Sequence, residues 1–489
     1  MGESRPRLAL DALLVTLVAL GLYLAFGHEL FFKFDGQHLV LRLVGRDPHY
    51  PRHVLYMPLL IAFGDLCDHV VRLSPYEKTR ALSAVGTAIA AGSVVLGAGL
   101  LGLGRGRRLA AGLAFALCPA VFLFGTVVEI HGAFLGVAGP AFVLACALGR
   151  PRADRAVELV LALAFGGLCG LATLVHASGF LLPGLLLPWV LVRRWGTGPL
   201  ALLRREDRAE GLGRSGLLLA AAMLPHLLLS LWLGDVFGAA DFVGEGFRHP
   251  QGLGYLPGIV WAEGLLPFLP LSLVAALCLL RPGAPRREAL ALGLGVAPYL
   301  WSALRLLVGD TEFGAYLLPA ALVAACLAAT YLPRRLLPVL VVLCAVGAGL
   351  AWRWQAGATE RYRVLAADWD RALGPDQDRS IVILADPEAL GAILVHLPGV
   401  RIFPADEPAK YDGDAVRRDF WPPVEAGIRD ELARRQRVFV TPGALAFWTS
   451  PVSDPRGGGH AFAALLEATF RLEDRSTPAV PLREVLPRD

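Results

Sequence analysis

The sequence predicts a polytopic α-helical membrane protein that ends in a small α/β domain. Hydrophobic residues make up 55% of the 489 residues, and the mean hydropathy is +0.55, above the usual values of soluble globular chains. Charged residues make up only 18%, and they gather between apolar runs of about 17–25 residues, the length of a bilayer-spanning helix. After Trp352 the apolar runs shorten and charges mix with turn residues, which indicates a separate domain.

We expect about eleven transmembrane helices from the apolar runs. The runs lie at 8–27, 80–104, 109–125, 132–149, 156–175, 179–192, 215–234, 262–280, 289–308, 317–333 and 336–352. The first run is longer than the apolar core of a signal peptide, and no small-x-small cleavage site precedes the polar loop after it. It therefore predicts an uncleaved signal anchor, with Arg5 and Arg7 on the cytoplasmic side.

The arginine distribution predicts the topology. Arginine clusters occur at 105–108, 150–155, 193–214, 281–287 and 334–335, whereas the alternate connections 126–131, 176–178 and, apart from Arg248, 235–261 contain almost no basic residue. We expect the protein in the inner (plasma) membrane of the cell. The positive-inside rule then places its arginine-rich loops on the cytoplasmic side. The net charge of +4 reflects this topology, so we expect no nucleic-acid partner.

The C-terminal part alternates short strand and helix patterns. Buried strands are predicted at 380–386, 399–403 and 438–441, with helical patterns at 387–397, 424–435 and 460–470. This alternation is typical of a small α/β domain. We therefore expect a transmembrane domain at 1–352, with a first outer loop at 28–79, and an extracytoplasmic domain at 353–489.

Polar residues concentrate in the first outer loop. Asp35 follows the first apolar run, and His49, Tyr50, Arg52 and His53 come shortly after it. A carboxylate just beyond a membrane span, in a histidine-rich loop with amphipathic flanks, predicts a reaction at the membrane surface. The alternative is a solvated loop acid with no chemical role.

Four motifs, all on the predicted outer face, resemble those of one enzyme superfamily. They are Asp35-Gly36-Gln37-His38 with Asp47-Pro48-His49-Tyr50-Pro51-Arg52-His53-Val54-Leu55-Tyr56, then Glu129-Ile130-His131, Gly170 to His176, and Glu312 to Pro319. In order and over about residues 8–335, they resemble the glycosyltransferase-C superfamily of integral membrane enzymes. The likeness is to the bacterial branch related to protein O-mannosyltransferases.

The resemblance implies transfer of a sugar, with inversion, from a polyprenyl-phosphate-linked donor to an extracytoplasmic protein, lipid or glycan. It implies that Asp35 is the catalytic base. The substrate-binding residues it suggests are His49, Tyr50, Arg52, His53, Glu129, His131, His176, Arg248 and Glu312. The family often has a second acid beside the first, where this chain has Gln37 or His38, so a divalent metal cofactor stays an open question.

Several alternatives remain at the level of the sequence. The amphipathic stretches 38–45 and 53–71 fit a groove for the donor lipid, and they equally fit packing onto the helical bundle. Glu129 fits a helix cap as well as a binding role. A transporter or flippase would show an inverted repeat and acids at mid-membrane, which are not evident. A catalytically inactive scaffold that binds lipid-linked sugars is a further alternative, because the second acid is missing.

Overall fold

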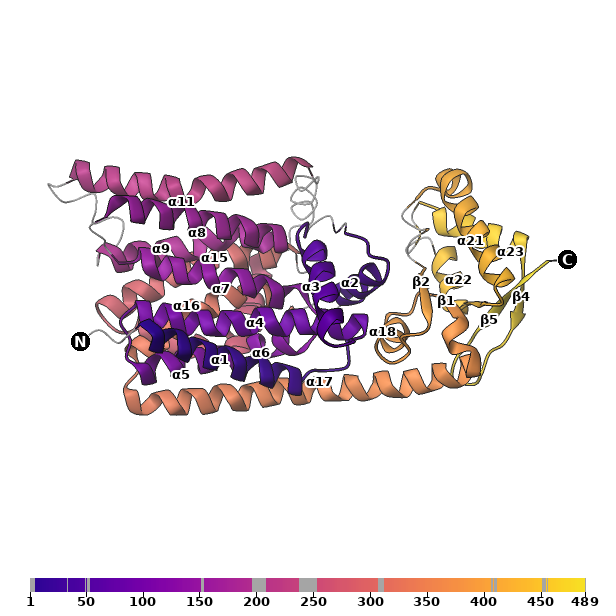
Figure 1. Ribbon diagram of the computed structural model, residues 1–489, viewed down its shortest axis with the longest axis horizontal. Coiled ribbons are helices and arrows are strands. Elements are labelled where there is room, and N and C mark those ends of the chain that lie inside the picture. The colour runs from indigo at the N-terminus through magenta and orange to yellow at the C-terminus, as the bar shows by residue number, and fades with distance from the viewer. Residues whose placement is uncertain are drawn as a thin grey trace. The chain divides into compact units, whose positions relative to one another are not determined.

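The computed structural model of the chain consists mainly of helices, with one small sheet near the C-terminus (Figure 1). It describes residues 5–32, 34–48, 50, 53–150, 154–195, 208–236, 253–306, 312–405, 408, 411–450, 454 and 456–488. Within these ranges the side chains of Arg5, Phe34, Asp35, Trp195, 208–215, 233–236, Leu253, 304–306 and Asp376 are not described. The chain divides into two compact units, Met1–His28 with Arg42–Trp354 and Glu29–Leu41 with Gln355–Asp489.

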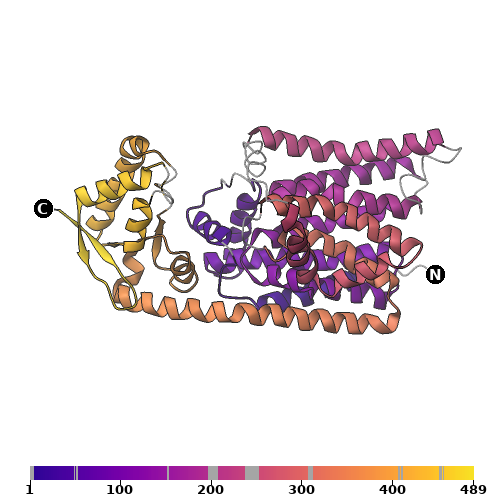
Figure 2. The same ribbon diagram turned by 180° about the vertical axis from the view of Figure 1, so that it is seen from behind.

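The helices of the first unit follow the apolar runs of the sequence. They are α1 (Arg5–Ala25), α3 (Tyr56–Val70), α4 (Pro75–Leu100), α5 (Arg105–Ala116), α6 (Pro119–Thr126), α7 (Ile130–Leu148), α8 (Arg155–Val175), α9 (Leu182–Trp195), α11 (Arg208–Val236), α13 (Leu256–Ile259), α14 (Leu271–Leu279), α15 (Ala284–Leu306) and α16 (Leu318–Tyr331). Short segments join or extend them: η1 (Ala177–Leu181), η2 (Leu253–Tyr255), η3 (Val260–Leu265), η4 (Leu266–Phe268), η5 (Ala315–Leu317) and η6 (Arg334–Leu336). α17 (Leu337–Leu373) begins in this unit and continues into the second as one helix of 37 residues, drawn in orange in Figure 2.

These helices are those of a multi-pass membrane protein. In the described part of the chain, five helices are long and apolar enough to cross a membrane, or seven if each of two bent pairs is one span. The bent pairs are α5 with α6, at 61°, and Leu256–Phe268 with α14, at 113°. A proline accounts for the first bend, because Pro119 starts a new helix and donates no backbone hydrogen bond to the preceding one. Each of the eleven predicted runs coincides with a helix or a bent pair, and the number of crossings stays a prediction.

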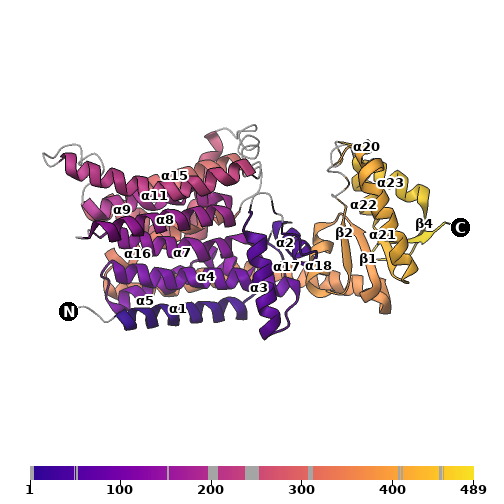
Figure 3. The same cartoon turned by 45° about the horizontal axis from the view of Figure 1, so that its top comes forward.

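Glycines allow α4 and α7 to pack with their backbones in contact. A Cβ atom on Gly86 would lie 2.3 Å from the carbonyl oxygen of Gly132, and one on Gly132 would lie 2.5 Å from that of Ser83. Gly136, four residues further along α7, would meet the backbone of Gly86 at 2.8 Å. This is the small-xxx-small spacing of closely packed membrane helices. The two helices lie side by side in Figures 1 and 3, so the start of α7, with Glu129, is held against α4.

The predicted first outer loop contains two helices, α2 (Phe34–Val44) and α3. The amphipathic stretches 38–45 and 53–71 fall largely within them. Asp35 was expected in a polar loop, and this expectation is wrong, because Asp35 lies in the first turn of α2. The residues 29–41, including this turn, belong to the second unit.

The second unit contains a five-stranded sheet with the order β2-β1-β3-β5-β4. The strands are β1 (Ser380–Leu384), β2 (Arg401–Pro404), β3 (Arg437–Val440), β4 (Phe470–Asp474) and β5 (Arg483–Pro487), and the other elements are η7 (Gly374–Arg379), α18 (Pro387–His396), α20 (Gly413–Ala415), η8 (Val416–Phe420), α21 (Trp421–Ala433), α22 (Pro442–Thr449) and α23 (Gly458–Thr469). β1 pairs in parallel with β2 and β3, whereas β5 is antiparallel to β3 and β4. The predicted α/β domain and its three predicted strands are present, and the structure shows that these three strands pair in parallel.

The sheet buries both faces at its parallel strands. Ile383, Val438 and Val440 pack in one core with α21 to α23. Val382 and Phe439, which alternate with them, pack in the other core with α18 and the end of α17. The β-strand alternation therefore explains why the sequence of these strands is apolar on both sides.

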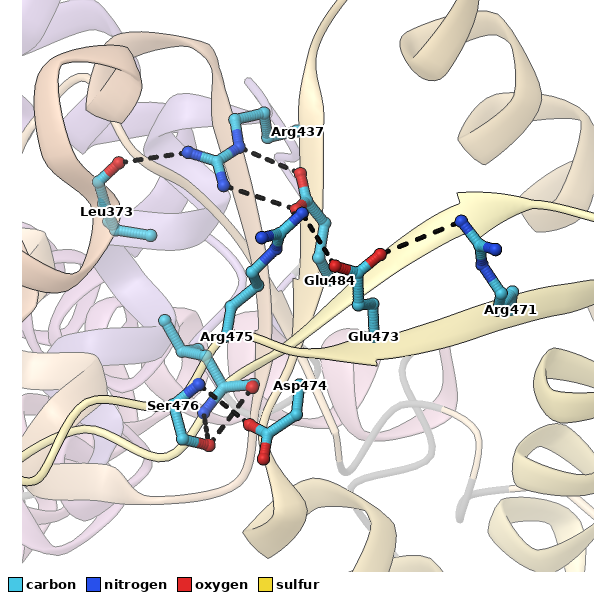
Figure 4. Close-up of polar contacts among 9 residues, drawn as sticks. Leu373, Arg437, Arg471, Glu473, Asp474, Arg475, Ser476 and Glu484 are labelled. Carbon is cyan, nitrogen blue, oxygen red and sulfur yellow. Dashed lines mark hydrogen bonds and ion pairs between the residues drawn. The ribbon is translucent and has the colours of Figure 1, made fainter.

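β4 and β5 were not predicted, because charges interrupt them. Glu484 on β5 accepts from Arg437 at 2.9 Å and from Arg475 at 2.9 Å (Figure 4). Glu473 on β4 pairs with Arg475 at 3.0 Å and lies 3.8 Å from Arg471. These ion pairs occupy one face of the two strands. The apolar residues by which a strand is recognised in a sequence are therefore missing from that face.

Candidate functional site

Five of the predicted site residues meet at one end of the first unit. They are Tyr50 and His53 before α3, Glu129 and His131 at the start of α7, and His176 directly after α8. α7 starts at this end, and α8 ends there, so the arginine-rich connection between the two helices lies at the opposite end of the bundle. We refer to His53, Glu129, His131 and His176 as the histidine cluster.

Glu129 is fixed as the N-cap of α7. Its side chain accepts a hydrogen bond from the main-chain N–H of Ile130 at 3.2 Å, and only 3% of the residue is exposed. The Ser83 hydroxyl on α4 donates to the Glu129 carbonyl oxygen at 2.6 Å. A carboxylate in this position is stabilised by the helix dipole. The expected capping role is thus present, and Oε2 of the same carboxylate also lies 3.6 Å from Nδ1 of His131.

The three imidazoles of the histidine cluster are in contact through His176. The rings of His53 and His176 stack with centroids 4.6 Å apart, and the ring of His131 lies 4.4 Å from that of His176. A main-chain hydrogen bond of 3.0 Å from Leu55 to the carbonyl of Leu174 holds the first loop against the end of α8. Residues that are more than 120 positions apart in sequence therefore share one site.

His176 is a neutral ring with a defined tautomer. Burial lowers its pKa well below the usual value, and the neighbouring His131 and His53 lower it further. Its Nδ1 accepts the main-chain N–H of Ser178 at 3.2 Å, so the ring hydrogen belongs on Nε2. A neutral imidazole offers hydrogen bonds and an aromatic face but no positive charge for a phosphate.

Two tyrosines that the sequence did not single out as site residues complete the surroundings. Tyr56 is fully buried, and its hydroxyl has no hydrogen-bond partner among the described residues. Burial and the nearby Glu129 raise the pKa of Tyr56, so the hydroxyl remains a donor. The ring of Tyr316 lies 5.9 Å from that of His131 and 6.1 Å from that of His176. Tyr316 could have been identified from the sequence, because it lies in the same motif as the predicted ligand Glu312.

Glu263 positions the segment that carries Tyr316. Its two carboxylate oxygens accept the main-chain N–H groups of Glu312 and Gly314, each at 2.7 Å, and the residue is 2% exposed. It lies in the π-helical segment η3, a conformation that often marks functional positions. Glu263 was not identified from the sequence, and the signal that could have identified it is a single acid within the apolar run 262–280. Glu312 itself was predicted to bind substrate, and in the structure its main-chain N–H donates a hydrogen bond to the Glu263 carboxylate.

The remaining predicted site residues are not described at the level of the side chain. Asp35 has a described backbone in α2, whereas His49, Arg52 and Arg248 lie outside the described residues altogether. Their roles as catalytic base and substrate ligands stay predictions. Among the described residues, no three His, Cys, Asp or Glu side chains converge in a way that could hold a metal ion.

No protein-family model and no curated protein matches the chain. Solved structures do match. Two crystal structures of ArnT from Cupriavidus metallidurans each share 15% identity and a TM-score of 0.54 with this chain. In the structure bound to undecaprenyl phosphate, the match covers 99% of this chain and 98% of that chain. In the apo structure, it covers 97% of each chain. The chain has the glycosyltransferase-C fold.

The same comparison found a looser likeness to a longer protein. The archaeal oligosaccharyltransferase AglB from Archaeoglobus fulgidus, in complex with an inhibitory peptide and a dolichol-phosphate, shares 14% identity and a TM-score of 0.48 over 97% of this chain and 74% of that chain. The likeness to ArnT extends over nearly the full length of both chains, so both the helical unit and the C-terminal unit take part in it. The resemblance expected from the four sequence motifs is confirmed for the fold.

Proposed function

We propose that this protein is a membrane glycosyltransferase that moves a sugar from a polyprenyl-phosphate-linked donor to an extracytoplasmic protein, lipid or glycan. The main support is the fold shared over 99% of the chain with ArnT bound to undecaprenyl phosphate. The buried histidine cluster gives independent support. Buried polar groups without protein partners, such as the hydroxyl of Tyr56, are expected to meet a polar ligand.

In the proposed reaction, Asp35 accepts the proton of the acceptor hydroxyl while its oxygen attacks the anomeric carbon. The bond between that carbon and the phosphate oxygen breaks, and polyprenyl phosphate leaves with the electron pair. Attack from the face opposite the leaving group inverts the anomeric configuration. Arg52 and Arg248 would stabilise the departing phosphate, because a guanidinium binds phosphate oxygens in a bidentate manner.

The histidine cluster suits the sugar better than the phosphate. Glu129 contributes negative charge, and His176 is neutral, so the cluster has little to attract a phosphate. Imidazole nitrogens, a carboxylate and the Tyr56 hydroxyl can instead exchange hydrogen bonds with sugar hydroxyls. His53, Glu129, His131 and His176 are therefore proposed as ligands of the sugar part of the substrate.

Replacement of Asp35 by Asn tests the proposal. Asparagine keeps the size and hydrogen bonding of the side chain but cannot take a proton, so kcat should fall about 10²-fold or more. The assay uses purified full-length protein and a defined polyprenyl-phosphate sugar. Asp65→Asn is a matched control, because Asp65 is an exposed acid on α3 that pairs with Arg46, and it should retain wild-type turnover.

Two results would contradict the proposal. The first is wild-type transfer by Asp35→Asn, and the second is retention of the donor's anomeric configuration in the product, measured by nuclear magnetic resonance. If the wild-type protein moved a lipid-linked sugar across vesicle membranes without transferring it, a flippase would be the better description.

A further inference from the structure

The helix that carries Asp35 packs with the C-terminal domain. Residues 29–41 group with 355–489 in the second unit, although more than 300 positions separate them in sequence. Leu41 packs against the core that contains Trp369 and Val382. The position of the first turn of α2 therefore depends on packing with the C-terminal α/β domain.

Gln37 makes the central polar contact of this packing. Its Nε2 donates to the main-chain carbonyl oxygen of Pro387, in the first turn of α18, at 2.8 Å. Gln37 is only 3% exposed, so this hydrogen bond is shielded from water. A buried amide that loses its hydrogen-bond partner is left desolvated and unsatisfied, so the contact favours one placement of α2.

A second link lies at the start of the same segment. Arg363 in α17 donates two hydrogen bonds to Oε2 of Glu29, at 3.0 and 2.8 Å. Both side chains are about half exposed, at 55% and 42%, so this ion pair is worth less than the buried amide contact. The segment 29–41 is thus held at its beginning by charge, in its middle by Gln37 and at its end by Leu41.

The distance from Gln37 to Asp35 along α2 is short. Two residues correspond to a rise of about 3 Å along an α-helix, so a backbone shift at Gln37 is transmitted to Asp35 almost unchanged. A displacement of about 1 Å of a catalytic group can lower a rate about 10²-fold. Asp35 would therefore depend on the contact between Gln37 and Pro387.

We propose that Gln37 is a positioning residue and that the C-terminal α/β domain holds the helix of the catalytic base in its productive place. This inference rests on the proposed function, since it assumes that Asp35 is the base. Gln37 is one of two positions, with His38, at which the resemblance led us to expect a second acid. In this chain the position serves to anchor the helix to the C-terminal domain through an amide donor.

Gln37→Glu is the sharpest test, because it preserves size and replaces the amide N–H donor with a carboxylate, and the added charge is matched in a control variant. At neutral pH its carboxylate cannot donate to the Pro387 carbonyl, and kcat for sugar transfer should fall about 10-fold to 10²-fold. The KM for the lipid-linked donor should stay within about twofold, because the proposed donor ligands lie elsewhere. Gln436→Glu makes the same change at a half-buried position of the same domain and should leave both constants unchanged.

Thermal unfolding of each purified full-length variant separates positioning from loss of fold. The expected result is a folded Gln37→Glu protein with a lowered kcat and a nearly unchanged KM. Wild-type kcat in Gln37→Glu, together with an inactive Asp35→Asn, would overturn the positioning role and leave the proposed function standing. Wild-type turnover in both variants would overturn the function itself. A fall in kcat that only follows the loss of folded protein, or that Gln436→Glu reproduces, would also overturn the role of Gln37.

Discussion

Burial determines the charge of two imidazoles in the first unit. His28 is 3% exposed, and its pKa is lowered to about 4, first by burial and then by the positive charge of Arg80. The pKa of His176 is also lowered by burial, and its two histidine neighbours lower it further. Both rings are therefore neutral at physiological pH. Their contribution is hydrogen bonding and aromatic contact, as in the stacking of His28 on Trp352 at 5.6 Å.

The lowered pKa of His28 predicts a loss of stability in acid. In the unfolded chain this histidine binds a proton near pH 6.5, whereas in the folded chain it does so only near pH 4. Its contribution is thus complete above pH 6.5 and is lost as the pH falls towards 4, by up to about 1.4 kcal/mol per pH unit. Thermal unfolding in detergent across this range measures it. His28→Asn should show a shallower decline, and an identical decline would contradict the assignment.

At the scale of elements, the turn before η5 shows how a side chain holds an unfavourable backbone. Phe313 and Gly314 both have positive φ, at 49° and 80°. This left-handed conformation is costly for a bulky residue such as Phe313. The Glu263 carboxylate binds N–H groups on both sides of the turn, and so stabilises it. This turn places Tyr316 beside the histidine cluster.

Glu263→Gln should weaken this turn. An amide has one acceptor oxygen, so one of the two N–H groups would lose its partner at a cost of about 1–3 kcal/mol. We expect a lower thermal unfolding midpoint and a fall of about tenfold in kcat/KM, because Tyr316 would leave its place beside His131. Unfolding and transfer assays measure both. Glu360→Gln changes an exposed acid of α17, and an equal effect there would refute the turn as the cause.

The elements themselves were largely predictable from hydropathy. The apolar runs coincide with helices, and the three parallel strands lie where apolar runs of four or five residues occur. β4 and β5 could not be recognised, because the ion pairs of Glu473 and Glu484 take the place of apolar contacts on one face. The breaks within spans depend on prolines such as Pro119, whose effect on direction appears only when the helices pack.

At the scale of the whole molecule, the arginine-rich connections also have a structural role. Arg108 pairs with the buried Asp11 at 2.6 Å, and Arg194 pairs with the buried Glu158 at 2.8 Å. Buried pairs of this kind are strongly destabilised when one partner is removed. These arginines therefore stabilise the bundle at the end opposite the histidine cluster, in addition to any role in membrane orientation.

The arginine pattern predicts that this end faces the cytoplasm and that the C-terminal domain lies outside. A reporter that is active only in the cytoplasm, fused after Trp354, should be inactive. The same reporter fused after Arg281, in an arginine-rich connection, should be active. An active Trp354 fusion would contradict the predicted orientation and would show that the positive-inside rule fails for this chain.

The sequence by itself determined the helical membrane class, the α/β ending and the kind of fold, because each depends on local hydropathy or on short motifs. Only the tertiary structure decided which polar residues share a site. The contacts of His53, Glu129, His131 and His176 depend on the close packing of glycines between α4 and α7 and on a hydrogen bond between Leu55 and Leu174. The grouping of Gln37 with Pro387 likewise joins segments that no local pattern connects, since such contacts arise from how distant elements pack.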